Sequence, residues 1–231
     1  MKMKRMMFAT AAVAAAAAAF LVPDLLDYHR FSTALDRQAQ ASQASGPWPQ
    51  FAETCFACHG PHGQSRNAEY PALAGQPAAY LEAQLRAFAN GQRDNLTMGP
   101  LARNLTDEQI RSLAAYYARQ APAGSPDAME NAALEARGKA VVQARSCQAC
   151  HGEALTGKEL APRLAGQAEH YIAHQLAAFK SGERHDASGA MDGIAATLSN
   201  EDIPAVARYL ARMSPDPRQI GARQDPAGQQ R

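Results

Sequence analysis

The chain has 231 residues, a hydrophobic share of 46% and a formal net charge of +1. This length accommodates one or two globular domains with ordinary apolar cores. The near-neutral charge excludes the strongly basic surface of a nucleic-acid-binding protein, so we expect no nucleic-acid partner.

The N-terminus has the pattern of an export signal. Three basic residues among the first five precede an apolar run from Phe8 to Val22, as in segments that direct a chain across the cytoplasmic membrane. The run has 15 residues, fewer than the roughly 20 that a spanning helix needs. Cleavage before Phe20 and retention of residues 1–26 as a membrane anchor both remain open. Either outcome predicts a periplasmic protein, soluble or tethered to the cytoplasmic membrane.

The composition then marks the domain boundaries. Residues 27–47 are rich in Ser, Gln and Ala and are predicted to be a spacer. A segment with Pro122, Gly124 and Pro126 separates two helical patterns, which predicts one domain over 48–121 and another over 126–214. We expect residues 215–231 to form a mobile tail.

One motif occurs once in each predicted domain. Cys55-Phe56-Ala57-Cys58-His59 recurs as Cys147-Gln148-Ala149-Cys150-His151, so the chain has two copies of C-x-x-C-H and uses all four of its cysteines in them. In this motif both thiols form thioethers with the haem vinyl groups, and the adjacent imidazole binds the iron. The sequence therefore predicts two covalently bound haem c groups, with His59 and His151 as iron ligands.

Two other interpretations of C-x-x-C-H fit less well. A structural zinc site needs four ligands, and each motif supplies three without a further Cys or His at the usual spacing. A redox dithiol needs no histidine and normally lies beside a strand-rich pattern, which this sequence does not show.

The residues after each motif also repeat, which indicates two copies of one domain. The shift is 92 residues at the cysteines, 91 in the following block and 93 near the end of each copy. The matching block contains a P-x-L-A-G-Q segment, a helical pattern and a G-x-R end, with first members Pro71, Leu73-Ala74-Gly75-Gln76, Tyr80, Gln84-Leu85, Phe88, Gly91 and Arg93, and second members Pro162, Leu164-Ala165-Gly166-Gln167, Tyr171, Gln175-Leu176, Phe179, Gly182 and Arg184.

Each copy is predicted to consist of helices joined by loops, because no stretch shows a period of two. A helix through Tyr80 and Phe88, and its counterpart in the second copy, end at the repeated glycines. Thr106 and Ser199 are predicted N-caps of the last helices, which run to about Gln120 and Met213. Another helix is predicted from Ser125-Pro126 to Ser146, before the second motif.

The second axial ligand of each iron is predicted to be methionine. Met98 and Met191 follow the motif histidines by 39 and 40 residues, and of the four methionines beyond residue 7 only these two repeat. Met129 and Met213 are assigned to core or surface. The histidines outside the motifs are alternative ligands, and a second histidine would lower the reduction potential of the haem. None of them repeats between the two copies: His62, His170, His174 and His185.

Together these features resemble the diheme cytochrome c4 family, with two class I cytochrome c domains, over about Phe51 to Met213. The resemblance rests on the two C-x-x-C-H motifs, the P-x-L-A-G-Q segments, the G-x-R ends and the two methionine loops. It implies an all-α protein whose domains are related by a pseudo-twofold axis and whose haems have histidine and methionine ligands.

The resemblance also suggests partners for the haem ligands. In class I domains the second ring N–H of the ligating histidine donates to the carbonyl of a loop proline, and Pro71 and Pro162 are the matching residues. Gln84, Gln175, Arg93 and Arg184 are weaker candidates for hydrogen bonds to the haem propionates, because such residues more often lie on a solvated helix face.

The two domains differ before their motifs. The second has a full predicted helix there, whereas the first offers only the short segment from Trp48 to Glu53. Trp48 and Phe51 are hypothesised to replace that helix by packing against Tyr116 or Tyr117.

Iron with both axial positions filled by the protein favours electron transfer over catalysis. We therefore expect a carrier of single electrons in a respiratory chain, with a donor such as a quinol-oxidising complex and an acceptor such as a terminal oxidase. The alternatives are the cytochrome subunit of a membrane-associated or flavin dehydrogenase and, less favoured by the repeated methionines, a diheme peroxidase.

Overall fold

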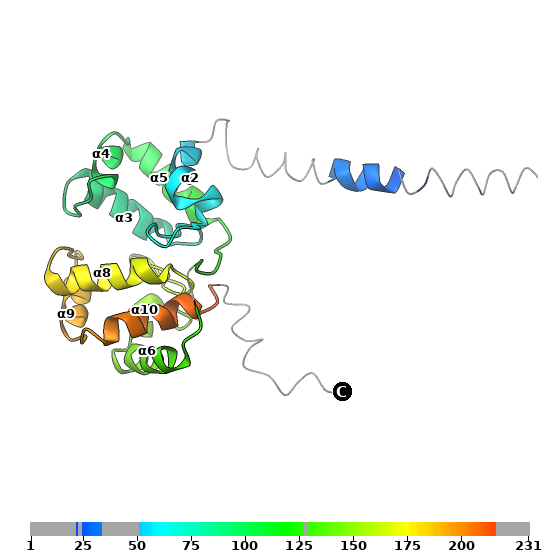
Figure 1. Ribbon diagram of the computed structural model, residues 1–231. Helices are drawn as coiled ribbons and strands as arrows, with labels where there is room; N and C mark the ends of the chain where they lie inside the picture. The colour runs from blue at the N-terminus through cyan, green and yellow to red at the C-terminus, as the bar shows by residue number, and fades with distance from the viewer. Residues whose placement is uncertain (1–21, 23–24, 34–50, 127–128, 216–231) are drawn as a thin grey trace, which may run out of the picture. The chain divides into compact units, whose positions relative to one another are not determined.

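The computed structural model describes residues 22, 25–33, 51–126 and 129–215 (Figure 1). The chain divides into two compact units, Met1–Gln50 and Phe51–Arg231, and both C-x-x-C-H motifs lie in the second. In the first unit, residues 25–33 are helical. Most of the predicted signal or anchor, much of the spacer, Trp48 and the predicted tail beyond residue 215 lie outside the described residues.

Helices and loops make up the described part of the chain. It contains no β-strand, and its isolated bridge joins Lys158 and Ala161. In these same ranges, no helix combines the length and the apolar character needed to cross a membrane. The prediction of an all-α fold is confirmed.

The first half of the second unit begins with short helical segments around the first motif and continues with longer helices. Its described elements are η1 (Phe51–Cys55), α2 (Phe56–His59), η2 (Pro61–Gly63), α3 (Ala78–Ala89), α4 (Met98–Arg103) and α5 (Asp107–Ala118). α3 packs against both α4 and α5.

The second half repeats the order of the α-helices, without described counterparts of η1 and η2 and with one additional helix before the motif. Its described elements are α6 (Ala132–Ala144), α7 (Gln148–His151), α8 (Glu169–Ser181), α9 (Ala190–Ala196) and α10 (Asp202–Arg212). In Figure 1, α10 lies between α6 and α8, and it packs against both.

Local chemistry explains where several helices begin and end. Thr106 accepts a hydrogen bond from the Gln109 N–H, and the Gln109 side chain accepts one from the Thr106 N–H, so the predicted capping box of α5 is confirmed. α8 ends at Gly182, whose φ of 79° lies in the left-handed region that glycine adopts without strain.

The helix before the second motif starts later than the sequence predicts. Ser125-Pro126 does not begin it; instead the side chain of Asn131 accepts a hydrogen bond from Leu134 N–H at 3.1 Å, and α6 starts at Ala132. An asparagine oxygen satisfies a free N–H of the first turn. That contact fixes the start of α6, six residues after Pro126.

Each half has its own apolar core. Val142, Leu155, Ile172, Leu176 and Leu210 belong to the core of the second half, which α6, α8 and α10 build together. In the first half no α6 equivalent is present in the described residues, and the core includes Tyr80, Tyr116 and Tyr117. The Tyr117 hydroxyl donates to Ala52 O at 2.7 Å, so α5 is tied directly to the segment before the first motif.

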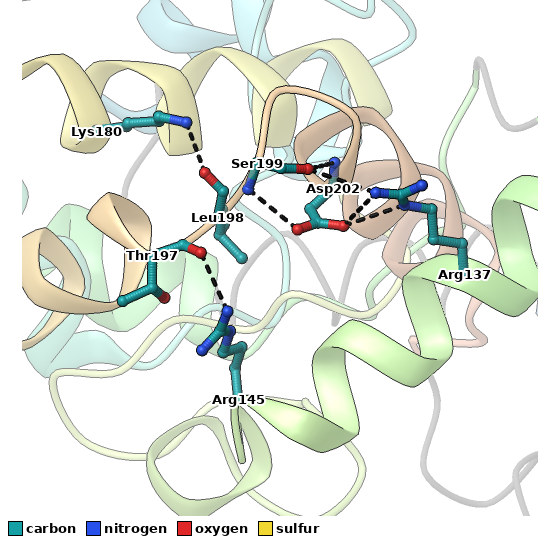
Figure 2. A network of polar contacts seen from close by, with 7 residues as sticks. All are labelled: Arg137, Arg145, Lys180, Thr197, Leu198, Ser199 and Asp202. Carbon is teal, nitrogen blue, oxygen red and sulfur yellow. Dashed lines mark hydrogen bonds and ion pairs between the residues drawn. The ribbon is translucent and has the colours of Figure 1, made fainter.

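A network of polar contacts holds the loop between α9 and α10 (Figure 2). The Asp202 carboxylate accepts from the Ser199 N–H at 3.0 Å, and the Ser199 hydroxyl accepts from the Asp202 N–H at 3.1 Å. The N-cap of α10 is Glu201, so the predicted cap at Ser199 was placed two residues too early. Arg137 of α6 donates to the Asp202 carboxylate at 2.9 Å. Arg145 and Lys180 donate to the carbonyls just before Ser199. The loop that follows the Met191 helix is therefore fastened to α6 and α8.

Candidate haem centres

The first motif is a single helical turn. Cys55 ends η1 and residues 56–59 form α2, so the side chains of Cys55 and Cys58 are three positions apart and share one face of the turn. Both thiols are half-buried, and neither is in a disulfide. Two neighbouring free thiols with an imidazole beside them are the chemistry that haem attachment requires.

The second motif repeats this geometry in α7. Cys147 is the N-cap residue of α7, and Cys150 is exposed; neither is in a disulfide. Burial raises the pKa of the Cys147 thiol, and the positive charge of Arg145 partly offsets the shift. Both copies therefore present the same set of thiols and imidazole.

Each motif histidine has one ring nitrogen already occupied. His59 Nδ1 lies 2.9 Å from Pro71 O, and His151 Nδ1 lies 2.8 Å from Pro162 O. Because a carbonyl only accepts, Nδ1 carries the proton and Nε2 keeps its lone pair. The structure thus brings together both histidine and proline pairs that the sequence suggested.

Burial makes both imidazoles suitable as metal ligands. His59 is 7% exposed and His151 is 6% exposed. This desolvation lowers the pKa of each ring, against the smaller raising effect of the proline carbonyl. A neutral imidazole with a free Nε2 is the form that binds iron.

Met98 and Met191 begin equivalent helices. Met98 is the first residue of α4 and Met191 is the second residue of α9, and both side chains are half-buried. Met191 also packs against the core that contains Leu176 and Leu210.

Side chains that the sequence analysis missed fix these two methionines. Asn95 Oδ1 accepts from the Met98 N–H at 2.8 Å, and Asp186 Oδ1 accepts from the Met191 N–H at 2.9 Å. Asn95 and Asp186 are 91 residues apart, so they are equivalent in the repeat. An oxygen-bearing side chain at the same place in both copies was the signal that would have found them.

The histidines that competed with methionine have other partners. His62 Nδ1 lies 2.9 Å from the Tyr116 hydroxyl, and His185 Nδ1 lies 2.9 Å from Asp192 Oδ2. His170 pairs with Glu69, and His174 contacts Gln175. All four rings therefore take part in contacts that differ between the two halves.

Gln84, Gln175, Arg93 and Arg184 do not form separate solvated faces. Arg93 donates to Gln84 at 2.7 Å and to Gln175 at 2.8 Å, and Arg184 donates to the same two amide oxygens at 3.0 and 2.6 Å. The arginines also donate to the hydroxyls of the opposite half, Arg93 to Tyr171 and Arg184 to Tyr80. This cluster joins the two halves, because each arginine makes the same kinds of contact with the opposite half.

The same cluster fits an anionic group. Its two guanidinium groups donate to amide and phenol oxygens, and Arg184 Nε is buried without a partner. A cavity of about 330 Å³ lies beside it, lined in part by Phe88, Asn95 and His174. Haem carries two carboxylate side chains, so these cations match the charge of the group that the motifs attach.

The loops after the two motifs also exchange contacts. Gln76 bonds the peptide N–H and carbonyl of Arg163 at 2.8 and 3.0 Å, and Gln167 bonds those of Ala72 at 2.7 and 3.0 Å. Gln76 matches Gln167, and Ala72 matches Arg163, in the 91-residue shift. This reciprocal pairing is what a pseudo-twofold relation between the halves produces.

Comparison with known proteins gives the same domain pair. The family model described as cytochrome c matches residues 49–119 and again 135–214. The thiosulfate dehydrogenase electron acceptor of Thiomonas intermedia (strain K12) is 39% identical over 75% of this chain and 83% of that protein. Cytochrome c4 of Thiocapsa roseopersicina is 39% identical over 78% of this chain and 93% of its own length.

A solved structure agrees with these sequence matches. The crystal structure of reduced recombinant cytochrome c4 from Pseudomonas stutzeri superposes with a TM-score of 0.64 at 31% identity, covering 70% of this chain and 94% of that one. The similarity extends over nearly the whole of the solved chain and therefore includes both halves.

Proposed function

This chain belongs to the diheme cytochrome c4 family, and we propose that it carries single electrons through two haems that are each held by one histidine and one methionine. Membership makes it an electron-transfer protein with two covalently bound haem c groups. Haem iron, when bound, supplies a centre that gains and loses one electron without a bond being formed or broken.

Cys55 and Cys58 attach one haem and Cys147 and Cys150 attach the other in this proposal. His59 and His151 would bind the irons through Nε2, and Met98 and Met191 would supply the other protein ligand of each iron. The observation that carries the assignment is the pair of Nδ1 contacts to Pro71 and Pro162 at 2.9 and 2.8 Å. These bonds fix the tautomer and the orientation of each ring before the iron is bound.

Filled axial positions support a carrier over a diheme peroxidase. A peroxidase needs one iron with an open position for its substrate. Asn95 and Asp186 hold the peptide groups of Met98 and Met191 in the same manner, which supports two equivalent closed centres.

The proposal also covers the electron donor and the electron acceptor of the protein. One relative is named a thiosulfate dehydrogenase electron acceptor, and this favours a dehydrogenase as electron donor over a quinol-oxidising complex. A terminal oxidase remains the proposed acceptor. The export pattern at the N-terminus supports a periplasmic location, with or without a membrane tether.

Replacing the methionines one at a time tests the ligands. In M98A and in M191A, we expect loss of about half of the long-wavelength sulfur-to-iron absorption of the oxidised protein, because one of two equivalent centres loses its thioether. The potential of that centre should also fall. Absorption spectroscopy and potentiometry measure both effects. M129A is the control, since Met129 is 71% exposed, and an undiminished absorption in M191A would contradict the assignment.

A kinetic measurement tests the donor. We expect stopped-flow mixing with a thiosulfate dehydrogenase and thiosulfate to reduce both haems, and omission of thiosulfate to leave them oxidised. Reduction by a quinol-oxidising complex but not by the dehydrogenase would contradict this donor while leaving the carrier role intact.

A further inference from the structure

Arg163 is an arginine buried in the contact between the two haem domains. It is 1% exposed and is among the largest fully buried side chains of the described residues. It directly follows Pro162, whose carbonyl contacts His151. Arginine is almost never fully buried without a charged partner, so this position needs an explanation.

The guanidinium of Arg163 contacts both halves of the protein. One terminal nitrogen donates to Ala165 O in its own loop, and the other donates to Ala74 O of the opposite loop at 3.1 Å. Ala74 and Ala165 are equivalent in the 91-residue shift. The cation therefore lies between matching carbonyls of the two loops that orient His59 and His151.

Its counterpart in the first half is Ala72, so only one half provides a charge. The surrounding backbone contacts are otherwise matched, since Gln76 bonds the peptide of Arg163 as Gln167 bonds that of Ala72. The Arg163 side chain breaks the near-symmetry of this interface with one unit of positive charge.

No anion among the described residues balances that charge. None of their ion pairs includes Arg163, and its Nε is buried without a partner. Burial lowers its pKa to about 10, so the side chain is still a cation at neutral pH. Carbonyl dipoles offset only part of the desolvation penalty of a buried charge. This fixed cation therefore adds a positive potential to the buried surroundings of the side chain, where the effective dielectric constant is lower than in water.

We propose that Arg163 sets the reduction potentials of this protein by stabilising the electron that each haem receives. Reduction adds one electron to a haem and lowers its charge by one unit, so a buried cation nearby favours the reduced state. This inference rests on the proposed electron-carrier function, because it assigns the charge that tunes the two centres.

The expected size follows from Coulomb's law. Two unit charges about 10 Å apart, in a medium of effective dielectric constant about 20, change an equilibrium constant by roughly tenfold. A tenfold change corresponds to about 59 mV for a one-electron couple. An exposed arginine has a much smaller effect, because water and salt screen it.

Spectroelectrochemical titration of the holoprotein at pH 7 tests the proposal with R163M, which removes the charge and keeps an apolar side chain of similar reach. We expect both haems to stay attached and the midpoint potentials to fall, by roughly tenfold in the reduction equilibrium constant for the more affected haem. A fall in either midpoint supports the proposal. Two unchanged midpoints, with the haem content intact, would overturn it.

Two further variants separate charge from packing. R163K keeps the cation and should retain the wild-type midpoints, so an equal fall in R163K and R163M would show a structural role and overturn the proposal. If R163M does not fold, R163Q takes its place, because the amide still donates to a carbonyl without carrying a charge. R111M, which removes an exposed arginine of α5, is the control and should leave both midpoints unchanged.

The wild-type titration distinguishes this proposal from the one on which it rests. Two one-electron couples with methionine-type absorption support the proposed function whatever R163M does. Their absence in the wild type would refute the proposed ligands, whereas unchanged midpoints in R163M alone would refute only the role of Arg163.

Discussion

At the scale of single residues, the haem centres depend on side chains that fix hydrogen-bond direction. Pro71 and Pro162 accept from the Nδ1 atoms of His59 and His151, and this leaves Nε2 as the only nitrogen able to bind a metal. Burial lowers the pKa of both rings, so the neutral form is present at neutral pH. In each half, a single proline carbonyl thus decides which nitrogen of the motif histidine is free to bind a metal.

Asp202 gives a pH dependence to the loop after the Met191 helix. Hydrogen bonding from the Ser199 N–H, with help from Arg137, lowers the pKa of this carboxyl below its ordinary value of 3.8. A lowered folded-state pKa stabilises the fold above about pH 4 and loses that contribution as the pH falls through the folded value. We expect D202N to lose about 1 kcal/mol of unfolding free energy at pH 7.

Denaturant titrations of D202N and the wild type over a range of pH check this expectation. The difference in unfolding free energy should shrink as the pH falls below about 4. E108Q, which removes an exposed carboxylate from the first turn of α5, is the control for loss of a negative charge. A difference between D202N and the wild type that stays constant down to acid pH would contradict the role of ionised Asp202.

At the scale of elements, the two domains support the same motif in different ways. The second domain packs α6 on α10, whereas the first ties the segment at Ala52 to α5 through the Tyr117 hydroxyl. The close contact of α6 and α10 depends on Gly138: a Cβ there would lie 2.0 Å from Ala205 O. Only a residue without a side chain lets the two backbones approach so closely.

Gly138 therefore reverses the usual effect of replacing a helical glycine. Glycine to alanine in a helix normally stabilises by about 1 kcal/mol, but we expect G138A to destabilise the second domain by about 2 kcal/mol, because α6 must move away from α10. Thermal or denaturant unfolding measures the change. G193A in α9 is the matched control, since nothing lies within 4 Å of its Cβ position, and it should be neutral or stabilising. Equal effects of the two changes would contradict the packing argument.

At the scale of the whole haem-binding unit, equivalent residues of the two halves make reciprocal contacts across the interface. Gln76 and Gln167 are each 3% exposed and bond the peptide of the opposite loop. Arg93 and Arg184 cross the same interface to the tyrosines of α8 and α3. The loops that orient the two histidines are thus part of one contact, and a change in one loop reaches the other directly.

Removing both glutamines is expected to uncouple the domains. In the double variant Q76A and Q167A, five buried backbone groups lose their partners, at about 1 kcal/mol or more each: the N–H and carbonyl groups of Ala72 and Arg163, and the N–H of Ala168. We expect unfolding of the holoprotein, followed by calorimetry, to separate into two transitions. The double variant Q92A and Q143A changes one exposed glutamine in each half and serves as the control. A single transition at the wild-type temperature in Q76A and Q167A would show that the interface does not depend on these side chains.

Much of the fold and the set of candidate ligands were predictable from the sequence. C-x-x-C-H is contiguous, so no tertiary structure is needed to predict that Cys55, Cys58 and His59 act together. The duplication then compares the chain with itself, and Met98 and Met191 stand out because they alone repeat. The capping box at Thr106 and the helix end at Gly182 were predictable for a similar reason, since both depend on residues within one turn.

Other features depend on residues that are distant in the chain. The start of α6 was predicted too early because the cap at Asn131 competes with the proline signal at Ser125-Pro126. Gln84 and Gln175 looked like solvated helix positions until the structure placed them beside Arg93 and Arg184 across the interface. Periodicity within one helix does not reveal which second helix will cover it.

The sequence alone determined that the chain carries two haem c groups in two copies of one all-α domain. The attachment motif consists of contiguous residues, and the repeat is visible when the chain is compared with itself. Only the tertiary structure decided that the two histidine loops meet, and that Arg163 is buried between them with no acidic partner in the described part of the chain, while Ala72 is the equivalent residue of the other half. Burial and charge balance arise from contacts across about 90 residues of chain, and such contacts exist only once both domains have folded and packed together.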